Sequence, residues 1–386
     1  MTGLSRRQVL GSLVATGVGA AAAGIGGTLA VQGAIAPQQD APTDAAPSGT
    51  PVEARGPHQA GISRPATPQT FGLIASIDLA GSADLSWLEA LGTAILTTTA
   101  LTSGESAELP EGAGDLTVTV GLGPRILSGV DAALPGAEAL PEFAKDAGID
   151  PSAVGGDLLL ALYATDPTIL APALDRLLTT LPAHTIRWGQ HGFRAPGRGT
   201  VTRNPLGFLD GIIVPHGAAE LDENVWIDEG PAAGGTVCVI RRLTLDRGAF
   251  AALPVADQEA TIGRAKIDGA PLSGGAPDAQ VNLTAKSPDG EYLVPADAHA
   301  RAAHPSFTGS ALMLRRGYAF DNGGADSGLM FICFQRDLRT FIATQQRLDE
   351  RDSLMEFATP TASASFLILP GFDENTPLGA SLANGR

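Results

Sequence analysis

The sequence predicts an α+β protein built from two tandem ferredoxin-like units, each an antiparallel sheet with helices on one face. Two observations predict this class. Short runs that are apolar, or that alternate with period two, indicate strands, and longer runs with helical periodicity lie between them. The order βαββαβ then occurs twice along the chain, although the two halves share no obvious sequence identity.

The first unit contains four predicted strands and two predicted helices. The strands are 71–79, 116–123, 158–165 and 186–195. One helix, 84–102, lies between the first two strands, and the other, 167–181, follows the third strand. Asp166 and Pro167 mark the start of this second helix, because aspartate caps free amides and proline fits the first helical turn.

The second unit repeats this order. Its predicted strands are 236–245, 311–320, 329–336 and 362–371, and its predicted helices are 257–266 and 337–357. If both uncovered sheet faces are apolar, the sheets pack face to face with the helices outside, as in a dimeric α+β barrel. A pocket can then open between sheet and helix in either half. Residues 268–307 match no element, and a run of this length without structure is usually functional or disordered.

The first 36 residues predict a targeting segment that is not part of the fold. The chain is uncharged from Gln8 to Gln39, and Arg6 and Arg7 just before it form the twin-arginine pattern. The export route for folded proteins reads that pattern, so we expect an extracellular, cell-envelope or periplasmic protein without stable membrane insertion after cleavage. An ordinary secretory signal or a membrane anchor is the alternative, since the stretch is long enough to span a bilayer.

Residues 37–56 are rich in Pro, Ala and Ser and predict a disordered linker. We place the two domains at 57–205 and 206–386. Without Arg6 and Arg7 the chain has 23 basic against 41 acidic residues, a net charge of −18. This charge argues against nucleic acid and anionic membrane surfaces as partners.

The residues of common hydrolytic sites are missing. The chain has no G-x-S-x-G elbow and no H-E-x-x-H motif, and neither Cys238 nor Cys333 has a histidine nearby. Both cysteines lie in apolar, strand-like runs, which favours two buried thiols over a disulfide or a metal site. A large core must therefore hold the protein together.

Three other groups of residues could carry chemistry. A single acid, Asp210, stands in an otherwise uncharged run between Gly207 and Gly211. His299 and His304 lie in the stretch without predicted structure. A neutral imidazole from one of them could be an axial haem ligand, and a surface or satisfied core histidine is the alternative reading.

The third group is Arg315 and Arg316, which follow each other in an apolar strand. On alternation only one of them can face a given side of the sheet. A buried guanidinium needs an anionic partner, and the candidates are Asp210, a haem propionate and a bound oxygen species. The alternative is that both arginines line a solvated sheet edge.

These segments together resemble the dye-decolourising peroxidase family, particularly its exported branch that includes the bacterial deferrochelatases. The resemblance rests on three motifs in order: G-x-x-D-G at 207–211, His-x-Arg-x-x-[Asn/His]-Pro at 299–305 and Arg-Arg-Gly at 315–317. Nearly all of the chain after the linker takes part. The family has the doubled ferredoxin-like fold, which agrees with the order of elements above.

Carried over residue by residue, the resemblance implies one haem b per chain and five roles. Asp210 is the distal acid, Arg315 the distal arginine and His299 the proximal iron ligand. Arg264 matches a position that pairs with a haem propionate, and Glu356 matches an acid near the proximal histidine. The implied activity is reduction of hydrogen peroxide with electrons from dye-like or phenolic molecules or from metal ions.

The sequence departs from the family at two positions beside the acid. The usual "GFKDGT" is here "GFLDGI", with Leu209 and Ile212 in place of a lysine and a threonine. We expect stronger desolvation to give Asp210 a higher pKa than in relatives. Three tyrosines and three tryptophans leave few routes to a surface aromatic, so we expect peroxide activation more than oxidation of bulky dyes.

Two other classes of function stay open on the sequence. One is a deferrochelatase or haem carrier that takes iron from haem or delivers haem without turnover, with components of an iron-uptake system as partners. The other is a non-catalytic module, with or without haem, that keeps only the fold. The sequence leaves a homo-oligomer open in each case.

Overall fold

The computed structural model of the protein describes residues 49–81 and 84–383. The predicted twin-arginine segment and residues 37–48 of the predicted linker lie outside this part of the chain. Within the described ranges, no helix is long and apolar enough to cross a membrane.

The first half forms the predicted βαββαβ order. Its elements are β1 Phe71–Leu79, α1 Trp87–Thr99, β2 Thr117–Leu122, α2 Pro124–Val130, η1 Asp146–Gly148, η2 Pro151–Ala153, β3 Leu158–Ala164, η3 Pro167–Ile169, α3 Leu170–Leu178 and β4 His184–Phe193. The strands pair antiparallel in the order β2-β3-β1-β4. The helix α2 was not predicted, although Pro124 occupies its first turn, where proline is favoured.

The second half repeats the order with more irregular connections. Its elements are β5 Thr202–Arg203, β6 Leu209–Asp210, α4 Gly217–Asn224, β7 Thr236–Leu245, α5 Arg247–Ala252, α6 Val255–Ile262, α7 His299–Ala302, η4 Pro305–Phe307, β8 Leu314–Arg315, β9 Tyr318–Asp321, β10 Ser327–Gln335, α8 Leu338–Arg351, η5 Ser353–Phe357, β11 Ala358–Ile368 and α9 Ala380–Ala383. The predicted strand 311–320 is therefore two short strands, β8 and β9, which both pair with β10.

The two half-sheets join at two short seams into one nine-stranded antiparallel sheet. β11 pairs with β2 at one seam, and Phe193 of β4 pairs with Ala319 of β9 at the other. One buried cluster between the halves contains Ile74 and Tyr163 from the first and Ile240 and Phe334 from the second. The predicted packing of two apolar sheet faces against each other is thus confirmed.

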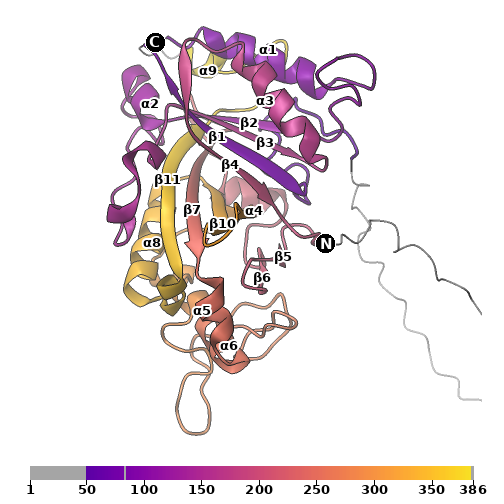
Figure 1. Ribbon diagram of the computed structural model, residues 1–386. Coiled ribbons are helices and arrows are strands. Elements are labelled where there is room, and N and C mark those ends of the chain that lie inside the picture. Colours follow the sequence, from indigo (N-terminus) through magenta and orange to yellow (C-terminus); the bar gives the residue numbers. More distant parts are fainter. Residues whose placement is uncertain (1–48, 82–83, 384–386) are drawn as a thin grey trace, which may run out of the picture. The chain divides into compact units, whose positions relative to one another are not determined.

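Helices cover the outer faces (Figure 1). Buried residues of α1 and α3 pack on the first half, and Leu338 and Phe341 of α8 pack on Val237 and Val239 of β7. Because side chains alternate along a strand, the neighbouring Cys238 instead belongs to the cluster between the half-sheets.

The two cysteines lie on opposite faces of the second half-sheet. Cys238 belongs to the cluster between the half-sheets, and Cys333 of β10 belongs to the outer cluster under α8. Both thiols are free and buried, as the sequence predicted. Burial raises the pKa of Cys333.

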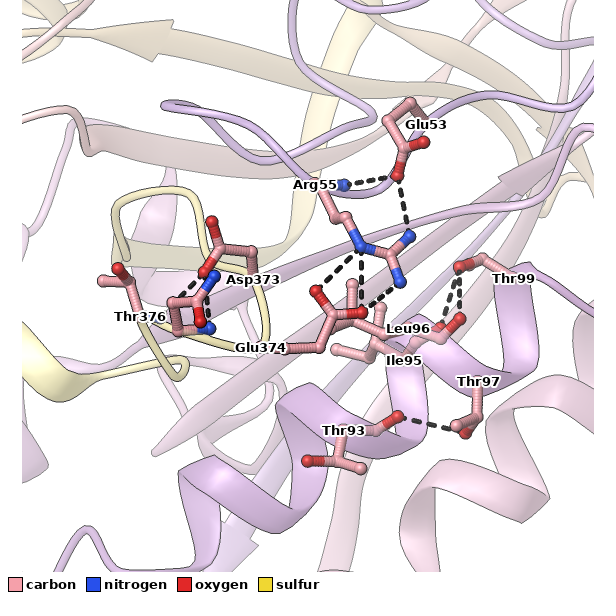
Figure 2. Close-up of polar contacts among 11 residues, drawn as sticks. Glu53, Arg55, Thr93, Ile95, Leu96, Thr97, Thr99, Asp373, Glu374 and Thr376 are labelled. Atoms are coloured by element: carbon pink, nitrogen blue, oxygen red, sulfur yellow. Dashed lines mark hydrogen bonds and ion pairs between the residues drawn. The ribbon is translucent and has the colours of Figure 1, made fainter.

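The predicted linker is packed rather than free at its C-terminal end. Ala54 belongs to the core of the first half, and the Nε of Arg55 donates to the Glu374 carboxylate at 3.0 Å (Figure 2). Gln59 then bridges Val120 and Leu369 through its buried amide. The ordered part of the chain therefore begins before residue 57. The Arg55 ion pair is exposed and contributes little stability by itself.

A buried ion pair ties η1 to the second half-sheet. Both terminal nitrogens of Arg241 on β7 donate to Asp146, at 2.7 and 2.6 Å, and the two side chains are 3% and 9% exposed. Breaking such a pair leaves a charge buried without compensation. We predict that Asp146→Asn lowers the free energy of unfolding by about 2–4 kcal/mol, measured by urea denaturation. The control Asp175→Asn, on the exposed face of α3, should change it by less than about 0.5 kcal/mol.

Candidate active site

A cavity of about 230 Å³ opens between the outer face of the second half-sheet and α8. Side chains from β7, β10, α8 and two loops line it, and most of them are aliphatic or aromatic. The volume is more than ten times what one water molecule requires. An apolar cavity with a few convergent polar groups is the usual form of a ligand site, and this position was one that the sequence predicted.

Asp210 and Arg315 meet at the wall of this cavity. Arg315 on β8 donates from Nη2 to Oδ1 of Asp210 at 3.2 Å, and from Nη1 to the carbonyl of Ile213 at 2.9 Å. Arg316 faces the opposite way and is buried between the half-sheets, where it donates to backbone carbonyls. The alternation expected from the sequence therefore selects Arg315 for the cavity.

Opposing influences set the protonation of Asp210. Burial is the largest and raises its pKa. The charge of Arg315, the amide of Gly211 at 2.6 Å and the charge of His299 together outweigh burial, so the pKa of Asp210 lies below its ordinary value. The net direction is thus set by the charges and hydrogen bonds around Asp210 and not by burial.

Two glycines give the chain around Asp210 its shape. Gly207 and Gly211 have φ of 86° and 81°, in the left-handed region that favours glycine. A Cβ on Gly211 would overlap the carbonyl oxygen of Thr200, whose hydroxyl donates to the carbonyl of Gly211 at 2.8 Å. Asn204, which the sequence reading did not single out, holds the turn by accepting from two backbone amides.

His299 lines the same cavity from the start of α7. Its Nδ1 lies 2.6 Å from Oδ2 of Asp352, whose side chain is fully buried. Burial lowers the pKa of His299, but the charge and hydrogen bond of Asp352 reverse this, so the pKa is raised. Nε2 has no hydrogen-bond partner among the residues that the structure describes, and it is available to a ligand.

The acid beside His299 is Asp352 and not Glu356, which we predicted for this role. Glu356 is exposed and makes no hydrogen bond to His299. Asp352 lies between α8 and η5, and its other oxygen accepts from the amide of Leu354. An aspartate before a short helical turn is a capping signal, but it predicts the turn and not the contact with His299.

His304, the other histidine of the segment, has both ring nitrogens occupied. Nε2 lies 3.1 Å from Oε1 of Gln280, and Nδ1 accepts from the amide of Ser306. Burial lowers its pKa. Of the two histidines, His299 is therefore the one with a ring nitrogen free for a metal.

Arg264 adds a buried positive charge to the cavity wall. Its guanidinium donates to the carbonyls of Gly269, Pro277 and Ala279 at 2.9, 3.2 and 2.9 Å. In the described part of the chain it contacts no carboxylate. Burial lowers its pKa, and the charge of Arg315 lowers it further. Arg264 thus orders the loop that follows α6 and leaves the cavity with more positive than negative charge.

Comparison with known proteins gives a consistent result. The family model "Dyp-type peroxidase, N-terminal" matches residues 59–194, and "Dyp-type peroxidase, C-terminal" matches residues 201–373. A dye-decolorizing peroxidase of Thermobifida fusca is 35% identical over 298 residues, which are 70% of this chain and 68% of that protein. A deferrochelatase of Yersinia pestis is 32% identical over 295 residues, 69% of this chain and 67% of that protein.

Solved structures resemble the chain over most of its length. A DyP-type peroxidase from Cellulomonas bogoriensis has a TM-score of 0.79 and 33% identity, covering 88% of this chain and 99% of that one. DtpA from Streptomyces lividans, solved as an oxyferrous complex, has a TM-score of 0.79 and 30% identity, covering 86% and 98%.

The turn around Asp210 gives a test of the site's geometry. We predict that Gly211→Ala lowers the free energy of unfolding by about 2–4 kcal/mol, because it combines a strained φ with a backbone overlap. Urea denaturation measures this change. As a control, Gly248→Ala in the exposed part of α5 makes only an ordinary contact with Oδ1 of Asp246 at 3.6 Å and should raise stability by about 0.5–1 kcal/mol. Equal effects of the two substitutions would contradict the role given to Gly211.

Proposed function

Because this chain belongs to the Dyp-type peroxidase family, we propose that it holds one haem b in the cavity and reduces hydrogen peroxide with electrons from small-molecule reductants. One observation carries this proposal. A histidine nitrogen with no hydrogen-bond partner among the described residues shares one apolar cavity with a paired carboxylate and guanidinium.

The residues of the cavity suit a haem. Nε2 of His299 would hold the iron, and the aliphatic and aromatic walls suit a flat apolar ring. Arg264 is a buried cation without a carboxylate partner in the described residues, and it would take a propionate as the resemblance implies. The haem supplies the redox chemistry of iron, and the protein supplies orientation, charge and proton transfer.

Asp210 is the proposed proton carrier. Its lowered pKa keeps the carboxylate ionised near neutral pH, so it can accept a proton from one peroxide oxygen and return it to the other. Arg315 holds this carboxylate and stabilises negative charge on the departing oxygen. Gly207 and Gly211 keep the short side chain at the cavity wall.

Asp352 is the proposed orienting residue for His299. A carboxylate that accepts from Nδ1–H fixes the tautomer in which Nε2 carries the lone pair. It also gives the imidazole more anionic character, which strengthens its donation to iron. The resemblance gave this role to Glu356, and the contact with Nδ1 of His299 supports our giving it to Asp352 instead.

Removal of iron from haem is the second candidate function. It is favoured by relatives named deferrochelatases at 32% identity. Release of iron without peroxide, retained in Asp210→Asn, distinguishes it from peroxide reduction. Under either function we propose export by the twin-arginine route, on Arg6 and Arg7 alone. The intact set of Asp210, His299 and Arg315 in one cavity argues against a degenerate module.

The ligand role of His299 is tested by absorption spectroscopy. We predict that His299→Ala, purified with haem supplied, loses or shifts the Soret band because the iron loses its axial nitrogen. His304→Ala is a matched control, since His304 lines the same cavity with both nitrogens occupied, and it should keep the band. An unchanged band in His299→Ala would remove the ligand assignment.

The roles of Asp210 and Arg315 are tested by stopped-flow mixing with peroxide between pH 4 and 8. Asp210→Asn cannot carry a proton, and we predict a loss of about 10²–10⁴-fold in the rate of the spectral change. The ionised form of Asp210 is lost only as pH falls through its lowered pKa, so the wild-type rate should hold above about pH 4.

In Arg315→Ala the loss of rate at low pH should begin at a higher pH, because the charge that lowers the pKa of Asp210 against burial is gone. Arg339→Ala, at a side chain 87% exposed, is the control and should leave the pH dependence of the rate unchanged. Wild-type rates in both Asp210→Asn and Arg315→Ala would show that neither residue acts on peroxide.

A further inference from the structure

A second cavity, of about 160 Å³, lies on the other side of the Asp210–Arg315 pair. Those two residues line both cavities, together with Asn204, Pro205, Gly211 and Leu329. The walls of the second cavity come from the end of β4, the segment around β5 and β6, the start of α5, and β9. None of the proton chemistry above uses it.

The second cavity is cationic in an acidic protein. Four arginines line it: Arg194, Arg203, Arg247 and Arg315. Among its lining residues Asp210 is the one acid. Its lining therefore carries a formal charge of +3, whereas the whole chain carries −16. Such a local field concentrates anions. Hydrogen peroxide is neutral and gains nothing from it.

Two of these arginines have donors to spare. Arg194 is 6% exposed, and its Nη2 donates to the carbonyl of Thr200, but its Nη1 is buried without a hydrogen-bond partner. Arg247 is half-exposed and forms an exposed ion pair with Asp321 at 3.8 Å, which is longer than a hydrogen bond. A buried guanidinium without a carboxylate partner is costly, and an anion bound nearby would offset its charge.

The cavity also has an apolar side. Phe193 at the end of β4 is 45% exposed although it is a large aromatic residue, and Pro205 and Leu329 also line the cavity. A cavity of about 150 Å³ is known to hold one benzene ring. The size and the two kinds of wall together fit a molecule with a single aromatic ring and one anionic group.

We propose that the second cavity binds single-ring aromatic carboxylates, with the carboxylate at Arg194 and Arg247 and the ring against Phe193. The proposal deepens the proposed function, because a hydroxylated member of this class bound beside Asp210 and Arg315 can be the reductant. Two such phenols each give one electron and one proton from O–H, and peroxide takes both pairs to form two waters. The site would then favour anionic over neutral phenols.

Binding is tested on the haem-loaded protein with 4-bromobenzoate, which has no phenol to oxidise. We expect calorimetric titration to show binding at least about tenfold tighter than that of the neutral 4-bromobenzamide. Arg247→Gln should raise the Kd for bromobenzoate about 5–10-fold. Arg339 is an exposed arginine elsewhere, and Arg339→Gln should leave this Kd unchanged. In soaked crystals the anomalous signal of bromine should lie beside Phe193.

Equal affinity for acid and amide, an unchanged Kd in Arg247→Gln, or bromine at another position would each overturn the proposal. These readouts do not depend on turnover. If binding follows the expectation and the protein fails to reduce peroxide, the anion site stands and the proposed function falls. If turnover is normal and bromobenzoate does not bind, the proposed function stands and the anion site falls.

Turnover gives a second measurement. Arg247→Gln should raise the KM for 4-hydroxybenzoate about 5–10-fold with kcat unchanged, and should leave the KM for 4-hydroxybenzyl alcohol as in the wild type. A merely structural role of Arg247 would change both substrates alike, and that result counts against the proposal.

Discussion

Side-chain alternation in the second half-sheet sends neighbouring residues to opposite faces of the sheet. One face packs in the cluster between the half-sheets, and the other lines the cavity. Met330 and Ile332 of β10 point into the cluster between the half-sheets, whereas Leu329 and Phe331 line the cavity on the other face. Arg316 and Arg315 divide in the same way. A shift of one residue in register would place a guanidinium in the wrong environment at both positions. The cavity therefore depends on the register that the pairing of β10 with β7 and β8 sets.

The buried arginines in these apolar regions differ in their partners, and this difference points to the candidate sites. Arg241 and Arg315 each have a carboxylate partner within the chain, Asp146 and Asp210. Arg264 and Arg194 have carbonyls but no carboxylate in contact, within the residues described here. Arg316 likewise has only carbonyls, but it lines neither cavity. Arg264 and Arg194 differ because each lines a cavity that could admit an anion. Arg264 lines the cavity proposed for haem, and Arg194 lines the cavity proposed for an aromatic carboxylate.

Asp210 lines both cavities, and its pKa is lowered although burial by itself would raise it. Burial alone would favour a neutral acid, and a neutral acid could not accept a proton from peroxide. Arg315 and the amide of Gly211 reverse that tendency. The same Arg315 faces the second cavity, so an anion bound there would share its charge with Asp210. The two sites are thereby coupled through one guanidinium.

The sequence by itself determined the elements that have a local period and the residues that stand in motifs. Strand and helix order follow from local periodicity, and alternation places Arg315 and Arg316 on opposite faces. The choice of Arg315 came from the motif that resembles the family, and the structure places Arg315 at the cavity. Only the tertiary structure decided contacts between segments far apart in sequence. Asp352 lies 53 residues after His299, and nothing in local spacing prefers it to Glu356.

The packing of Ala54 and Arg55, within a stretch whose composition predicts disorder, was decided by the core and by Glu374 at the other end of the chain. The second cavity has the same origin. Phe193, Arg247 and Asp210 come from separate segments, and only the seam between β4 and β9 brings those segments together. Long-range pairing sets such neighbours, because local periodicity states which way a side chain points but not what it meets.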